Sequence, residues 1–162
     1  MAEGSDFDEL VDALDYPMYV VTARDGDERG GCLVGFTTQT SIDPARFLVC
    51  ISKANATART VDGATHVGVH LISRAEIKVA RLFGEESEDW TDKFAHCDWR
   101  DGPYDVPVLD AAAAWFVGAI LERLDLGDHS GLLLDPVASG GQATSDFLTF
   151  QQLKNLDPGH PA

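Results

Sequence analysis

Residues that could bind an anion gather in one stretch of an otherwise acidic chain. The 162 residues include 27 acidic and 12 basic side chains, which gives a formal net charge of −15. Residues 44–61 nevertheless contain no Asp or Glu, and they include Arg46, Lys53 and Arg59. The polar run TTQTS at 37–41 precedes them. Hydroxyls, amides, cations and the N–H groups of a helix start are donors that hold phosphate. An ordinary hairpin edge with solvated cations would show the same spacing.

Three strands are expected to position these groups. Pro44 has no N–H and disfavours helical geometry in the residue before it, so the stretch divides there. We expect a strand at Gly30–Thr38 and a strand buried on both faces at Phe47–Ser52. An earlier strand at Met18–Ala23 would pair with Gly30–Thr38, because Asp25-Gly26-Asp27 between them is a turn signal.

Periodicity predicts further elements on either side. Apolar residues at helical spacing from Phe7 to Leu14 follow Ser5, a plausible N-cap, and predict an amphipathic helix. The other expected elements are a short helix or turn at 55–61, a half-buried strand at 66–72, a helix from Ser73 to Phe83 that stops at Gly84, a flexible pair Gly140-Gly141, and a last strand at 147–150.

The histidines and cysteines in the middle of the chain give no metal signature. His66 and His70 fall on an expected strand, where residues four apart are too distant to share a metal, so we expect surface or interface residues. Cys32, Cys50 and Cys97 have no metal-ligand spacing and suggest no disulfide framework. Each is interpreted as a small core residue, and no metal site is predicted.

Residues 85–110 form the least regular stretch. They are acidic and carry Trp90, Trp99 and two prolines. Long loops inside compact domains are usually functional or disordered, and the aromatic residues argue against disorder. We therefore expect this stretch to fold over the mouth of an active site.

Composition limits the class of protein. The chain length predicts one domain, and 44% hydrophobic residues fit a globular fold. The sequence has no long apolar span and no signal-peptide pattern, so a cytoplasmic location is expected. The excess of acidic residues argues against binding to nucleic acid or to an anionic membrane.

Several motifs together resemble a known family. The pattern G-x-x-V-x-x-x-T-x-x-S-x-D-P, then a buried strand, then K-x-x-x-T, resembles the flavin reductase-like family of FMN-binding split barrels. In this chain the pattern consists of Gly31, Val34, Thr38, Ser41, Asp43, Pro44, Lys53 and Thr57. Three later fragments are similar to that family and occur in its order: Leu82-Phe83-Gly84, Asp92-Lys93-Phe94 and Gly127-Asp128-His129.

The resemblance implies a fold. It is a mainly β, α+β domain built on a six-stranded Greek-key split barrel, usually a homodimer with flavin near the subunit interface. Residues 113–125, which could also pass for a helix, then become a strand that turns at Gly127-Asp128 into a return strand at 129–137. The single domain would comprise an N-terminal helix at 1–15, the barrel at 18–137 and a C-terminal extension at 138–162.

The resemblance also implies an activity, an NAD(P)H-dependent flavin reductase that transfers hydride from nicotinamide to flavin N5. FMN is the expected cofactor, FAD is possible, and NADH or NADPH is the co-substrate; a partner monooxygenase would receive reduced flavin. His129, oriented by Asp128, would be catalytic. The residues expected to bind the cofactor are Gly35, Phe36, Thr37, Thr38, Gln39, Thr40, Ser41, Ser52, Lys53, Asn55, Thr57, Lys93 and Phe94.

One departure from the family pattern bears on affinity. Family members commonly carry small hydroxyl or amide residues between the first glycine and Thr38, whereas this chain has the run CLVGF at 32–36. Backbone N–H groups could replace some of the missing donors, and Gly35 allows close approach. Two other functions stay open, an enzyme that uses another flavin-like cofactor such as a deazaflavin, and a non-catalytic flavin-binding module. The chain shows no catalytic triad pattern, GxGxxG motif or P-loop.

Overall fold

Two hairpins begin the fold in the computed structural model, which describes residues 5–85 and 92–154. In the first, β1 (Tyr19–Asp25) pairs antiparallel with β2 (Glu28–Val34), and Gly26 turns with a φ of +61°. In the second, β3 (Thr37–Ser41) pairs with β4 (Arg46–Ser52). The predicted first hairpin and the predicted strand at 47–52 are confirmed.

The single strand expected at Gly30–Thr38 is wrong. It breaks at Gly35-Phe36, because β2 lies at one edge of the main sheet and β3 lies at the other. The strand order is β2-β1-β5-β8-β9-β4-β3, and every neighbouring pair is antiparallel. The chain therefore crosses from one edge of the sheet to the other within two residues.

Three strands form the middle of the sheet, and two of them are long. They are β5 (His66–Ile72), β8 (Ala112–Asp125) and β9 (His129–Gly141). The mainly β fold is confirmed, with seven strands in the main sheet where six were expected. The expectation of flexibility at Gly140-Gly141 is wrong, because both glycines pair with β8 opposite Trp115 and Ala114.

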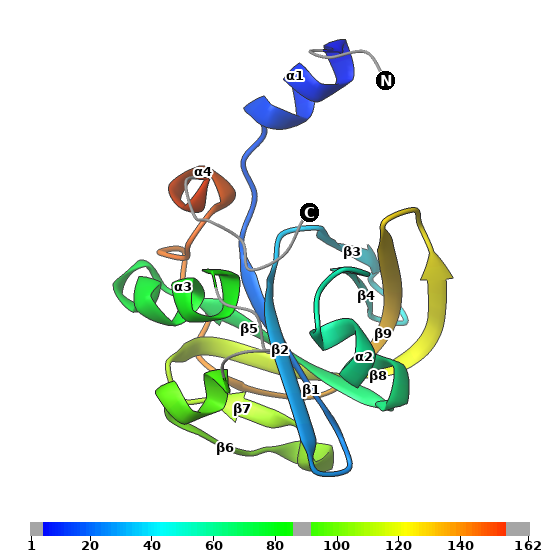
Figure 1. Cartoon of the computed structure of the whole chain (residues 1–162), viewed down its shortest axis with the longest axis vertical. Helices are drawn as coiled ribbons and strands as arrows, with labels where there is room; N and C mark the ends of the chain where they lie inside the picture. The colour runs from blue at the N-terminus through cyan, green and yellow to red at the C-terminus, as the bar shows by residue number, and fades with distance from the viewer. Residues whose placement is uncertain (1–4, 86–91, 155–162) are drawn as a thin grey trace.

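Two clusters of buried side chains make the core. One fills the barrel with residues such as Val21, Val49 and Leu132. The other includes Phe83 and Leu109 and packs helix α3 (Ile77–Glu85) and the segment after it against the outside of the sheet. Figure 1 shows the barrel strands with these layers beside them.

Residues 92–110 belong to this outer layer. They form the 3₁₀ helix η2 (Lys93–His96), β6 (Trp99–Asp101), the 3₁₀ helix η3 (Pro103–Asp105) and β7 (Pro107–Leu109). Their expected position over the mouth of the site is wrong, because their apolar residues cover the outer face of β1 and β5. Residues 86–91 of the same expected loop lie outside the described residues.

The remaining helices are short. They are α1 (Asp6–Ala13), α2 (Thr57–Gly63) and α4 (Phe150–Leu153), and the 3₁₀ helix η1 (Arg74–Glu76) leads into α3. Ser5 caps α1 as predicted, accepting from Asp8 N at 3.2 Å, whereas Gly84 lies inside α3 and does not end it. The expected strand at 147–150 forms isolated bridges. None of the described helices is long and apolar enough to span a bilayer.

His70 corrects an expectation about the surface. It is fully buried, because the segment 92–110 covers its face of β5. Its Nδ1 lies 2.9 Å from Val20 O, and its Nε2 accepts from Leu109 N at 3.2 Å. The ring is therefore neutral with its proton on Nδ1, and burial lowers the pKa of His70 to about 4. His66 is half-buried and stacks on Tyr104 at a centroid distance of 4.1 Å.

We expect His70 to make folding stability fall at acidic pH. The unfolded chain titrates this group near its ordinary pKa of 6.5, while the folded pKa is about 4. The unfolded state therefore binds the proton first, and stability present above pH 6.5 is lost as the pH falls towards 4, by about 3 kcal/mol for the full shift. Urea unfolding near pH 7 and pH 4.5 measures it. His70→Gln should flatten this dependence, and His66→Gln is the control. Equal pH dependence in wild type and His70→Gln would contradict the assignment.

Candidate functional site

One large cavity lies between the barrel and the two ends of the described chain. Its volume is about 700 Å³, and its walls come from β2, β4, the end of α3, α1 and α4. Most lining side chains are apolar, including Met18, Leu33 and Phe83. Ser52, Asn55 and His129 bring polar groups to it. A cavity with apolar walls and a few convergent polar groups is the usual form of a small-molecule site.

The two-residue connection between β2 and β3, Gly35-Phe36, shapes one wall of the cavity. A Cβ atom on Gly35 would lie 2.7 Å from Tyr16 Cε1 and 2.9 Å from Met18 Sδ, so a larger residue would displace these two side chains of the cavity wall. Phe36 O accepts from Cys50 N at 2.9 Å, which fixes the backbone of this connection against β4. The Phe36 side chain stays 54% exposed at the cavity.

His129 is the first residue of β9 and directly follows the turn that connects β8 to β9. Its Nδ1 lies 2.7 Å from Asp128 Oδ1, and its ring lies 4.9 Å from the Phe36 ring at a tilt of 45°. The hydrogen bond with His129 lowers the pKa of Asp128. Asp128 O accepts from Lys53 N at 2.9 Å, so the turn is fastened to the end of β4. With Nδ1 engaged, Nε2 is the ring nitrogen left for a ligand.

Ser52 and Asn55 lie where β4 leads into α2. Ser52 Oγ accepts from Ala54 N at 3.3 Å, and Asn55 Oδ1 accepts from Thr57 N at 2.9 Å. These local bonds use the acceptor side of each group. The hydroxyl hydrogen of Ser52 and the NH₂ group of Asn55 are therefore the donors that can meet a ligand.

The structure brings five of the predicted site residues to the cavity. They are Gly35, Phe36, Ser52, Asn55 and His129, and Asp128 adjoins them through its hydrogen bond. None of the predicted residues of the TTQTS run at 37–41 lines this cavity. Thr37 and Thr38 belong to β3, while Gln39, Thr40 and Ser41 line an open hollow at the β3–β4 hairpin together with Ile42 and Asp43.

The positive island expected from the sequence does not exist in three dimensions. Lys53 Nζ lies 2.6 Å from Asp125 Oδ1, and Arg46 and Arg59 also pair with carboxylates from other strands, Asp135 and Glu28. The Lys53 side chain lines a separate cavity of about 310 Å³ beside α2, and Thr57 is fully buried at the start of that helix. The geometry thus removes these two residues from the main cavity.

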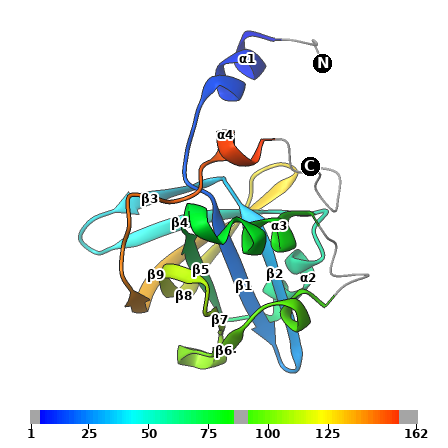
Figure 2. The same cartoon turned by 90° about the vertical axis from the view of Figure 1, so that its left-hand side faces the viewer.

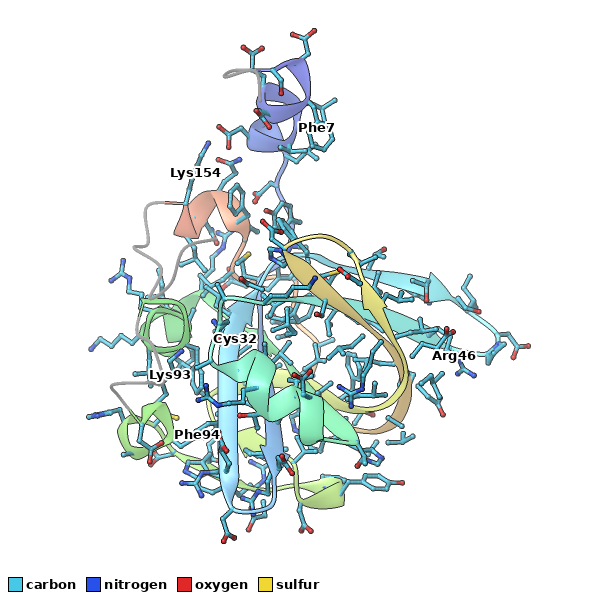
Figure 3. The ribbon with its side chains drawn as sticks, turned by 45° about the vertical axis from the view of Figure 1, so that its right-hand side comes forward. Phe7, Cys32, Arg46, Lys93, Phe94 and Lys154 are labelled. Carbon is cyan, nitrogen blue, oxygen red and sulfur yellow. The ribbon has the colours of Figure 1, made fainter. Side chains whose placement is uncertain are left out.

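Lys93 and Phe94 are structural rather than cavity residues. Lys93 is 1% exposed, and its Nζ donates to Phe83 O at 3.0 Å and Gly31 O at 3.3 Å. Phe94 packs edge-on against Phe83 and Trp99. Figure 3 shows both beside α3 and η2, apart from the cavity residues Phe7 and Lys154. Neither side chain lines the main cavity, and the ammonium group of Lys93 donates to backbone carbonyls in the core.

Sequence reasoning missed the walls contributed by the chain ends. Tyr16 and Phe150 stack at 4.9 Å with an interplanar angle of 13°, and both line the cavity. Leu153 and, from α1, Phe7 and Val11 line it as well. The available signal was the helical spacing of apolar residues near the N-terminus. It predicts a helix with one apolar face but does not identify what that face packs against.

The fold is that of a split-barrel domain with a large, mainly apolar cavity. A model of the flavin reductase like domain matches residues 11–151. The chain therefore belongs to the flavin reductase like domain family.

Named relatives agree with this membership. The chain is 33% identical over 125 residues to the stachydrine N-demethylase reductase subunit of Rhizobium meliloti, covering 75% of this chain and 52% of the relative. It is 30% identical over 129 residues to the reductase component of the flavin-dependent trigonelline monooxygenase of Acinetobacter baylyi, covering 77% of this chain and 41% of the relative. This chain thus spans about half or less of the length of these two relatives.

Solved structures share the fold. A flavin reductase domain protein from Arthrobacter superposes with a TM-score of 0.80 at 22% identity, covering 88% of this chain and 87% of that one. An NADH:FAD oxidoreductase from Streptomyces globisporus superposes with a TM-score of 0.80 at 21% identity, covering 92% and 91%. At these identities the likeness establishes the architecture.

Proposed function

We propose that the protein is an NAD(P)H-dependent flavin reductase that holds FMN, or alternatively FAD, in the main cavity. The observation that carries this proposal is that apolar walls meet one polar edge, where Ser52 pairs with His129 across β4 and β9 and Asn55 and Asp128 lie beside them. Family membership supports it. Bound flavin would supply the acceptor for a hydride from the nicotinamide.

The residues of the cavity fit such a ligand. A flat ring system needs apolar faces, which Met18, Leu33 and Phe36 provide. Because Lys53 is paired with Asp125 away from this cavity, we assign the phosphate to the neutral donors of Ser52 and Asn55. The walls of α1 and α4 limit the access of water.

His129 would orient the nicotinamide. The Asp128 carboxylate engages Nδ1, so Nε2 is the ring nitrogen that meets the nicotinamide, and in the tautomer with the proton on Nδ1 it is a hydrogen-bond acceptor. An acceptor suits the carboxamide NH₂ group of a nicotinamide. The Phe36 ring supports the other side of the imidazole and restricts its rotation.

We also propose that the protein acts as a homodimer that supplies reduced flavin to a partner monooxygenase. The support for the acceptor is that two relatives are named as reductase partners of an N-demethylase and a monooxygenase. The support for the homodimer is the set of exposed apolar residues around the cavity, Phe7, Val11 and Phe36. Light scattering should give the mass of two chains at micromolar concentration.

The activity is tested by mixing purified protein with FMN or FAD and following NADH or NADPH oxidation. We expect turnover that requires both flavin and protein. Flavin binding without nicotinamide oxidation would indicate a binding module. Failure of both flavins to bind, measured by quenching of flavin fluorescence, would indicate another cofactor. Riboflavin titrated beside FMN measures the contribution of the phosphate.

A further inference from the structure

The first helix exposes an apolar face that its own chain leaves uncovered. Helix α1 has eight residues and no buried side chain. Phe7, Leu10, Val11 and Leu14 form one stripe, and they are 69%, 58%, 37% and 49% exposed. Isolated helices shorter than about 12 residues are marginal in water, so most helices owe their stability to packing. This stripe, which we name the arm stripe, therefore indicates a surface that another body covers.

The chain's own contacts hold the arm at its C-terminal end. Gln151 Nε2 donates to Asp12 O at 2.9 Å and to Leu14 O at 2.8 Å, and Lys154 Nζ donates to Asp12 O at 3.4 Å. Figures 1 and 2 both show α1 standing off the barrel beyond α4. Phe7 and Val11 nevertheless reach the mouth of the cavity. The arm is thus anchored at its base and placed where a covering body would also meet the cavity.

Charge decides what that body can be. The arm carries the carboxylates of Asp6, Asp8, Glu9 and Asp12, so two arms packed on each other would bring like charges together. A cationic surface beside an apolar rim suits it better.

The same chain presents such a surface. Within residues 5–85 and 92–154, Lys78 and Arg81 are the two cationic side chains that have no hydrogen bond or ion pair. Both are exposed on α3, whose last turn lines the cavity through Phe83 and Gly84. Phe36, 54% exposed, adds an apolar group to the lining of the same cavity.

We propose that α1 is an arm exchanged between two copies of this chain. The arm stripe packs at the mouth of the partner copy's cavity, and the carboxylates of the arm face Lys78 and Arg81 of the partner subunit. Each copy has an exposed apolar helix and, at its cavity, an exposed apolar rim beside unpaired cations. A reciprocal exchange would bury the helix of each copy against the rim of the other. Each flavin site is then completed by residues from two chains. The inference rests on the proposed homodimer and flavin site.

The first test removes the apolar contact. Phe7→Asp/Val11→Asp should reduce the mass in light scattering from two chains towards one and raise the FMN dissociation constant roughly tenfold or more. Tyr104→Asp is the control, because Tyr104 is 60% exposed on η3, away from the cavity lining. A variant that stays dimeric with unchanged FMN affinity overturns the inference while leaving the proposed homodimer and reductase intact. A wild-type mass of one chain would instead remove the homodimer itself.

The second test separates exchange from an arm that folds onto its own chain. Asp6→Lys/Asp8→Lys/Glu9→Lys/Asp12→Lys reverses the charge of the arm, and Lys78→Glu/Arg81→Glu reverses the charge of its expected receiver. Each variant alone should dissociate, and an equimolar mixture should recover dimers, because every arm then meets a complementary partner. If the arm instead docks on its own chain, mixing the two variants should not restore dimers, and that result would overturn the proposed exchange. Mass is measured without flavin, so failure of the proposed activity cannot imitate either outcome.

Discussion

His129→Ala is expected to lower kcat/KM for the nicotinamide substrate about a hundredfold, because small misplacements of reacting groups cost on that order. The loss should appear with little change in melting temperature. Asp128, the hydrogen-bond partner of His129, is 80% exposed, so solvent screens their pair and it contributes little to folding stability. The FMN dissociation constant should also change little, since the apolar walls remain.

The experiment pairs a thermal melt with separate FMN and NADH titrations of the purified variant. Asp128→Ala should show a smaller loss of the same kind, because the imidazole stays but loses its fixed tautomer. His66→Ala is the control, a half-buried histidine stacked on Tyr104 and remote from the cavity lining. If His129→Ala melts much earlier, the residue is structural. If it melts and turns over normally, its proposed role in orienting the nicotinamide is wrong.

Local sequence patterns predicted a strand correctly where the spacing of apolar residues was enough to identify it. The strands at 18–23, 47–52 and 66–72 were found because their apolar residues alternate or run together over a few positions. The break at Gly35-Phe36 was missed, because residues 30–38 are suited to a strand throughout. What divides them is the placement of β2 and β3 at opposite edges of the sheet, which is a property of the whole fold.

The apparent positive island of residues 44–61 was misleading for a similar reason. A window along the chain counts the charges of residues 44–61 without those of their neighbours across the sheet. Strand β4 pairs with β9, and this pairing places Asp135 beside Arg46. The β8–β9 turn region likewise places Asp125 beside Lys53. Local sequence charge therefore predicts a site poorly in a sheet whose partner strands are far apart in the chain.

The resemblance predicted the candidate site in part, because its motif residues Thr38, Ser41, Lys53 and Thr57 do not line the main cavity. Phe36, Asn55 and His129 came from the resemblance and lie at the cavity. The walls from the chain ends, such as Tyr16 stacked on Phe150, depend on packing between segments more than 130 residues apart. No periodicity or spacing in either segment specifies that contact.

Lys93→Ala is expected to destabilise the fold by about 4 kcal/mol, although sequence motifs suggested a place at the flavin. The ammonium group of Lys93 joins two elements, β2 through Gly31 O and α3 through Phe83 O, from a position 1% exposed. Hydrogen bonds to a charged group contribute about 1.5–3 kcal/mol each, and truncation also leaves a cavity. Lys93→Met fills most of the volume and should cost about half as much.

Urea unfolding at neutral pH measures these losses, with Arg59→Ala as the control. The ion pair of Arg59 is exposed, and such pairs contribute about 1 kcal/mol or less. FMN titration of folded Lys93→Met should give nearly the wild-type dissociation constant, because Lys93 does not line the cavity. Unchanged urea unfolding combined with weakened FMN binding would show instead that Lys93 contributes to flavin binding. A large loss of stability with retained affinity would establish that this buried cation fastens α3, and with it one wall of the cavity, to the barrel.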